Sequence, residues 1–97
     1  MKINASPLDY YSQYDEDSYF ERLGRIPSVV SYRGVGHQLE IEFDEKKVNA
    51  EDCRELIALF CRYRNSLAPL RQLAKIPGNE WINNKQGFWY GEMFAGE

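Results

Sequence analysis

The residues best suited to chemistry are three acids at alternate positions, Glu40, Glu42 and Asp44. This spacing places them on one face of a β-strand, with neighbouring carboxylates about 7 Å apart. Such a pair can act as general acid and base, or bind a hard cation. The same pattern is also that of a solvated strand face, and no calcium-loop spacing accompanies it. A small enzyme that uses Glu40 and Glu42 is therefore the least favoured of three functional hypotheses.

The only basic and aromatic grouping contains Arg62, Arg64 and Arg71, with Tyr63 between the first two. Basic residues clustered in this way occur on nucleic-acid-binding surfaces. However, the helix that would present them begins with acidic residues, and cations near a helix C-terminus also stabilise the helix dipole. A nucleic-acid or ribonucleoprotein-associated module, with Lys75 as a further contact, is the alternative hypothesis.

Other reactive residues do not form a recognisable site. Cys53 and Cys61 lie eight residues apart on one predicted helix, about 12 Å along its axis. A disulfide needs Cα atoms within about 7 Å, so we expect two reduced thiols. His37 is the only histidine, and the Gly34–Gly36 turn lacks the helix and third glycine of a dinucleotide loop. We expect no metal, cofactor or catalytic residue.

The net charge of −3 is unevenly distributed. Residues 3–21 contain five acids and no Lys or Arg, whereas residues 46–75 contain seven basic residues against three acids. Such a molecule can contact partners of either sign on different faces. The acids Asp15, Glu16 and Asp17 form the densest cluster in the first segment.

The length of 97 residues is that of a single domain, covering 1–97. No apolar run approaches the roughly 20 residues of a membrane span, and the N-terminal region lacks the apolar stretch of a signal peptide. We expect a cytoplasmic protein with no membrane partner.

The elements that position these residues can be predicted from periodicity. Asp15 is the expected N-cap of a helix over 15–23. Residues 28–33 and 38–43 read as an antiparallel hairpin, whose second strand directs Leu39, Ile41 and Phe43 to one face. Residues 2–5 are a weaker candidate for an edge strand.

Two or three helices follow the hairpin. A helix over 50–63 begins at an Asn49 cap, a shorter one over 66–74 begins at Ser66, and a last turn or two spans 88–94. The predicted fold is a small α+β domain, with an N-terminal helix, the hairpin and these helices packed on the apolar face of the hairpin. Because the edges of a hairpin are unpaired, we also expect strand addition or a homodimer, with the face of residues 38–44 forming one side of the interface.

Aromatic residues are concentrated at the two ends of the sequence. Trp81, Phe88 and Trp89 are expected to close the core by covering the hairpin, because a helix that contains Gly91 needs packing to persist. The N-terminal tyrosines are the expected anchors on a partner. They are Tyr10, Tyr11 and Tyr14.

The segment DCRELIALFCRYRNSLAPLRQLA and the ending EWINNKQGFWYGEMFAG resemble a group of short bacterial proteins. These share a "DLR-LI-L--RY" helix, a "QLA" segment and an ending "W…FWY---FG". The resemblance covers roughly residues 28–97 and implies a fold family rather than an activity. The matching residues are Arg54, Leu56, Ile57, Leu59, Arg62, Tyr63, Gln72, Leu73, Ala74, Trp81, Phe88, Trp89, Tyr90, Phe94 and Gly96.

In size and acidity the chain is also similar to immunity proteins of contact-dependent inhibition and other polymorphic toxin systems. That resemblance implies a non-enzymatic protein that neutralises a cognate toxin, often a nuclease, by direct binding. Binding at the toxin's active site and binding away from it both remain open. The leading hypothesis is therefore an immunity protein. Its expected contacts are Glu40, Glu42, Asp44, Asp15, Glu16, Asp17, Tyr10, Tyr11 and Tyr14.

Overall fold

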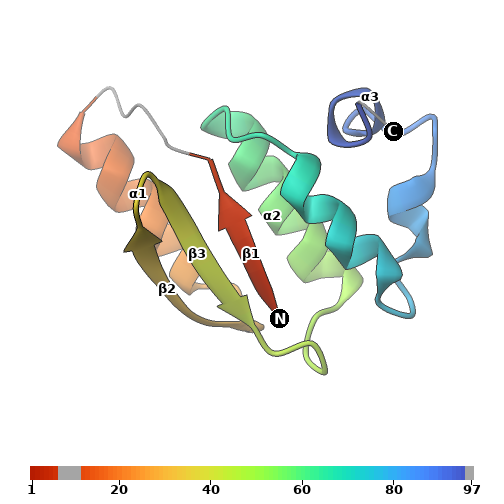
Figure 1. The fold of residues 1–97 in the computed structure, drawn as a ribbon, viewed down its shortest axis with the longest axis horizontal. Coiled ribbons are helices and arrows are strands. Elements are labelled where there is room, and N and C mark those ends of the chain that lie inside the picture. Colours follow the sequence, from red (N-terminus) through yellow and green to blue (C-terminus); the bar gives the residue numbers. More distant parts are fainter. Residues whose placement is uncertain (7–11, 96–97) are drawn as a thin grey trace.

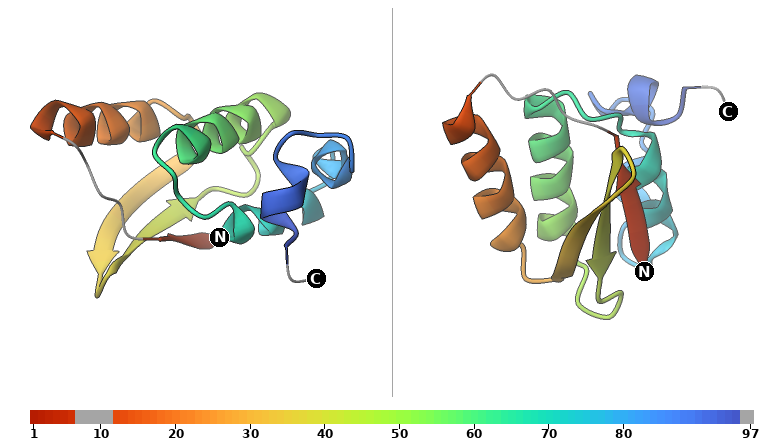
Figure 2. Two further views of the ribbon diagram at one scale, coloured as in Figure 1. Left: turned by 90° about the horizontal axis from the view of Figure 1, so that it is seen from above. Right: turned by 60° about the vertical axis from the view of Figure 1, so that its left-hand side comes forward.

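A three-stranded antiparallel sheet lies under two helices in this computed structural model, which describes residues 1–6 and 12–95 (Figure 1). The strands, in the spatial order β1-β3-β2, are β1 Lys2–Ala5, β2 Val29–Val35 and β3 Gln38–Phe43. The two helices, α1 Gln13–Gly24 and α2 Ala50–Arg62, cover one face of the sheet (Figure 2). The predicted α+β architecture is confirmed, and so is the weakly predicted strand over residues 2–5.

The alternation of polar and apolar residues along β3 determines which face of the sheet is buried. Ile41 and Phe43 are buried under the helices, and Ile3 and Ala5 of β1 join them in the core. Burying an aliphatic side chain contributes about 1.5–3 kcal/mol to stability. A one-residue slip of β3 would lose this contribution and would bury Glu40 and Glu42 instead.

Strand β3 is the central strand, which corrects one expectation. Both of its edges are paired, with β1 on one side and β2 on the other, so strand addition at residues 38–44 is excluded. The outer edge of β1 lies against η1 Ala68–Lys75, a 3-10 helix that continues the layer of the sheet (Figure 2). Among the described elements, none pairs with the outer edge of β2.

Helix α1 begins earlier than predicted. Its N-cap is Ser12, whose hydroxyl accepts a hydrogen bond from the Asp15 backbone N–H at 3.2 Å, so Asp15 lies in the first turn rather than at the cap. Both residue types cap helices well, and sequence alone did not decide between them. Tyr19 and Leu23 face the core as expected.

Helix α2 follows its predicted pattern closely. The Asn49 side chain accepts from the Asp52 N–H at 2.8 Å, which confirms the cap. At the C-terminal end, the Asn65 N–H donates to the Phe60 carbonyl and the Arg64 N–H donates to the Cys61 carbonyl. These two bonds form a Schellman motif, and they place Arg64 in the left-handed region at φ 60°.

The C-terminal third consists of short helical turns. The segment expected to be an α-helix over 66–74 is η1, and two further pieces follow, η2 Glu80–Asn83 and α3 Tyr90–Met93. The inward side chains Leu67, Leu70 and Leu73 are buried as predicted. The C-terminal segment packs beside η1 and α2, on the side away from the hairpin, so the expectation that it covers the hairpin is wrong (Figure 1).

A buried amide connects the separate layers. Asn65, which is 1% exposed, donates from Nδ2 to the Ser6 carbonyl at 3.0 Å. Its Oδ1 accepts from the Tyr19 hydroxyl of α1, also at 3.0 Å. One side chain therefore holds the end of β1, the middle of α1 and the connection from α2 to η1.

The strained backbone at Arg64 gives a direct test of the helix end. An L-residue in the left-handed region costs about 1–2 kcal/mol of stability, and glycine avoids this cost. Glycine also gives the unfolded chain more conformational freedom, which offsets part of the gain. We expect Arg64→Gly to raise the free energy of unfolding by about 0.5–1 kcal/mol, measured by urea denaturation. The matched change Arg62→Gly, at the last residue of α2, is expected to lower it. Destabilisation by Arg64→Gly would contradict this description of the helix end.

Candidate binding surfaces

The acidic side chains of β3 lie on the sheet face opposite the helices, but neighbouring strands compensate their charge. Glu40 Oε1 is 3.6 Å from Lys2 Nζ on β1 and 3.3 Å from Arg33 Nε on β2. Its side chain is only 19% exposed. Cross-strand pairs of this kind stabilise a sheet by a fraction of a kcal/mol. Glu40 is therefore a structural residue of the sheet rather than a free negative charge.

The two other acids of this face have local partners as well. Glu42 accepts a hydrogen bond from the Ser31 hydroxyl at 3.4 Å, and Asp44 Oδ1 accepts from the Lys46 N–H at 3.1 Å. The alternation correctly predicted that Glu40 and Glu42 share the face of β3 opposite the buried Ile41 and Phe43. It did not predict the basic and hydroxyl side chains that the neighbouring strands place beside them.

The acidic cluster of α1 occupies its first turns. Asp15 and Glu16 are half-buried, and Asp17 is exposed with its Oδ1 accepting from the Gln13 side chain at 2.9 Å. Acids in this position stabilise the positive end of the helix dipole. Tyr14 in the same turn is 84% exposed. Tyr10 and Tyr11 lie outside the described residues.

Large exposed apolar side chains identify a surface that the sequence did not. Five such side chains are exposed in the described residues, and β2 carries three of them. They are Val30 at 64%, Tyr32 at 40% and Val35 at 46%. A β-bulge between Val29 and Ser31 shifts the register there, and every residue from Val30 to Val35 is exposed. Helix α1 and strand β2 together form one side of the molecule (Figure 1).

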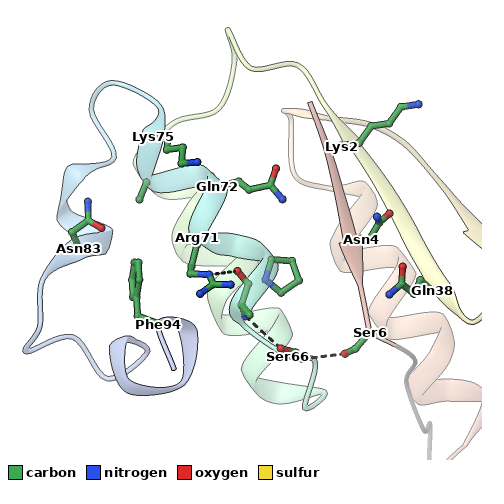
Figure 3. A pocket seen from close by; sticks show the side chains of 13 residues that line it. Lys2, Asn4, Ser6, Gln38, Ser66, Arg71, Gln72, Lys75, Asn83 and Phe94 are labelled. Atoms are coloured by element: carbon green, nitrogen blue, oxygen red, sulfur yellow. Dashed lines mark hydrogen bonds between the residues drawn. The ribbon is translucent and has the colours of Figure 1, made fainter. Parts of the chain in front are cut away.

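The three predicted arginines lie at the end of α2, just after it, and on η1. Arg62 and Arg64 are exposed at the end of α2, while Arg71 is half-buried on η1, where its Nε donates to the Ala68 carbonyl at 3.1 Å. Arg71 and Lys75 of η1, together with Lys2 of β1, line one groove of about 840 Å³ between β1 and η1 (Figure 3).

The β1–η1 groove has mixed walls. Besides its three cations, the described lining contains amides and hydroxyls together with Ala68, Pro69, Ala74 and Phe94, and none of its described lining residues is Asp or Glu. Its walls are joined at one end, where the Ser66 N–H donates to the Ser6 hydroxyl at 3.0 Å. The amide side chains are Asn4, Gln38, Gln72 and Asn83.

The C-terminal aromatic residues form a second, smaller hollow of about 450 Å³ against α2. Trp81 and Trp89 are half-buried, with ring centroids 5.4 Å apart in an edge-to-face arrangement, and Arg54 of α2 stacks over Trp81. The predicted packing role is confirmed for both tryptophans. It is wrong for Phe88, which is 77% exposed at the rim.

Neither cysteine is an activated nucleophile. Burial raises the pKa of the Cys53 thiol to about 11, with a smaller contribution from Asp52. Burial, followed by Glu92, also raises the pKa of Cys61. Both thiols are free and protonated at neutral pH. His37 is exposed in the hairpin turn, and no metal-ligating cluster is found among the described residues.

No protein-family model, curated protein or solved structure matches this chain. The longest described helix, α2, has 13 residues, and none of the described helices combines the length and apolar character needed to cross a bilayer.

The aromatic hollow depends on a glycine. A Cβ atom on Gly87 would lie 2.6 Å from Cε2 of Trp89, inside van der Waals contact. We expect Gly87→Ala to lower the free energy of unfolding by about 1–3 kcal/mol, because the indole must move. Gly91→Ala on α3 is the matched control, since nothing lies within 4 Å of its added Cβ, and it should be neutral or stabilising. Equal effects of the two changes in thermal unfolding would contradict the close contact.

Proposed function

We propose that this protein is a non-enzymatic binding module that holds a protein partner on its α1–β2 side. The observation that carries the proposal is the exposure of β2, an edge strand on which Val30 is 64%, Tyr32 40% and Val35 46% exposed, although the Tyr32 ring also stacks on Phe20 of α1. Apolar side chains gathered on an exposed edge are typical of sites that another protein covers.

The edge of β2 also offers backbone hydrogen bonds. Residues Ser31 to Val35 all pair with β3, and the other edge of β2 pairs with no described strand. In an antiparallel pair, alternate residues direct their peptide groups away from the partner strand. An extended segment of a partner can bind these groups, and the apolar side chains can contact its alternate residues. Charge complementarity selects a basic partner, because the first turns of α1 place Asp15, Glu16 and Asp17 on the same side of the molecule.

The most specific form of this proposal is an immunity protein that neutralises a cognate bacterial toxin. A toxin domain with a basic surface, such as a nuclease, matches the acidic end of α1 and explains why a small acidic module would present an uncovered edge. In this proposal the acids of α1 accelerate encounter and β2 supplies most of the affinity. Glu40, Glu42 and Asp44 contribute less than the sequence suggests, because neighbouring groups already occupy them.

The proposal requires a toxin domain encoded directly upstream of this protein's gene, and that domain is the partner used in the test. Co-expression should restore growth to cells that produce the domain, and calorimetry should detect a one-to-one complex. We expect Val35→Asp to weaken binding by about tenfold or more, equivalent to about 1.4 kcal/mol. Asp17→Lys should slow association several-fold at low salt. Glu92→Lys changes an exposed acid on α3 instead and should change neither value.

Three outcomes would refute the proposal. The first is that no toxin domain is encoded nearby, or that the domain does not bind. The second is that Glu92→Lys weakens binding as much as Asp17→Lys does. The third is a homodimer in sedimentation equilibrium that Val35→Asp dissociates, which would assign β2 to a second copy of this chain.

A further inference from the structure

We propose that the β1–η1 groove binds a small phosphate ester, a second ligand independent of the protein partner proposed above. The groove lies between β1 and η1, whereas the partner surface is on α1 and β2 (Figure 1). The two sites also differ in charge, so they select different ligands.

The charge of the groove is the first argument. In a chain with a net charge of −3, the described lining residues include Lys2, Arg71 and Lys75 and no acid. Lys75 is exposed and forms no ion pair with a described residue. In the ion pair of Lys2 with Glu40 the lysine side chain is 56% exposed. An exposed ion pair of this kind contributes at most about 1 kcal/mol to stability. Lys2 can therefore turn toward an anion at little cost.

The hydrogen-bonding groups are the second argument. Lysine and arginine only donate, and each primary amide of the lining adds two N–H donors. A phosphate ester has three acceptor oxygens and carries about −1.5 to −2 charges at pH 7. Gln72 points from η1 toward β1, whereas Asn83 and Phe94 lie on the other side of η1 (Figure 3). The amide side chains of the groove can form hydrogen bonds with hydroxyl groups or ring nitrogens in the remainder of the phosphate ester.

The size of the groove supports a small molecule. Its volume of about 840 Å³ lies within the roughly 300–1,000 Å³ of small-molecule sites. Arg71 is held in place by its bond to the Ala68 carbonyl, and the walls are fixed at the Ser6–Ser66 contact. A preformed site of this kind loses little entropy when it binds a ligand.

The same features disfavour a nucleic-acid strand. Single-stranded binding requires a series of aromatic rings along a basic channel. Among its described lining residues this groove has one aromatic ring, that of Phe94, whose centroid lies 4.6 Å from that of Tyr90 in a stacked pair. Arg62 and Arg64, which would extend the basic track, are not among the lining residues.

The experiment is an amide-resolved NMR titration of the folded protein with AMP, ribose 5-phosphate and glucose 6-phosphate. Adenosine, ribose and glucose are the unphosphorylated controls, and sulfate and a short oligothymidylate are the competing anions. We expect saturable shifts at Asn4, Gln72 and Lys75 with at least one ester. Lys75→Glu should weaken binding by about tenfold or more, and Lys75→Gln by less, because the reversal adds repulsion. Lys85→Glu, an equal charge change at an exposed residue outside the groove, should have no effect.

A pH series separates a phosphate ester from a general anion. The second phosphate pKa is about 6, so affinity for the ester should fall several-fold as the pH decreases from about 7.5 to about 5. Sulfate keeps both charges over this range and should bind equally at both ends. The proposal is overturned if no ester gives saturable shifts, if Lys85→Glu weakens binding as much as Lys75→Glu, or if the oligothymidylate binds more tightly than every ester.

Discussion

The side chain of Asn65 is the interaction on which the arrangement of this protein depends. It is buried, and it bonds the Ser6 carbonyl at the end of β1 and the Tyr19 hydroxyl of α1. Removing it would break both hydrogen bonds, each of which contributes about 0.5–1.5 kcal/mol to stability. The chain reaches Asn65 through the Schellman turn at Arg64, so the end of α2 is coupled to β1 and α1 through one amide.

The hydrogen bonds of Asn65 explain how the molecule holds two surfaces of opposite charge on different sides. On one side α1 and β2 present acids and apolar side chains. On the other side Lys2 of β1 and Arg71 and Lys75 of η1 line one groove. The Ser6–Ser66 bond next to Asn65 fixes the end of the groove. The acidic and basic residues that are unevenly distributed along the sequence therefore lie on different sides of the molecule. The acids of β3 lie between the two surfaces, and basic neighbours on both adjacent strands compensate Glu40.

Local patterns in the sequence predicted the local structure well. The alternation of residues 38–43 gave the hairpin and its buried face, and Asn49 with the apolar stripe of α2 gave that helix, because periodicity and capping are properties of neighbouring residues. The non-local features were missed. Lys2 and Lys75 line one groove only because of the tertiary fold, and a buried Asn65 within a polar stretch has no distinguishing pattern in the sequence. The exposure of β2 follows from the strand order, which alternation cannot determine.

Native-state hydrogen exchange of Asn65→Ala tests the central role of this amide most directly. If Asn65 joins the layers, amide protection at Ile3 and Ala5 of β1 and at Leu70 of η1 should fall together, by about tenfold for each 1.4 kcal/mol lost. The amides that pair β2 with β3 should keep their protection relative to global unfolding. Loss of protection confined to residues 64–66, with β1 and η1 unchanged, would contradict the account.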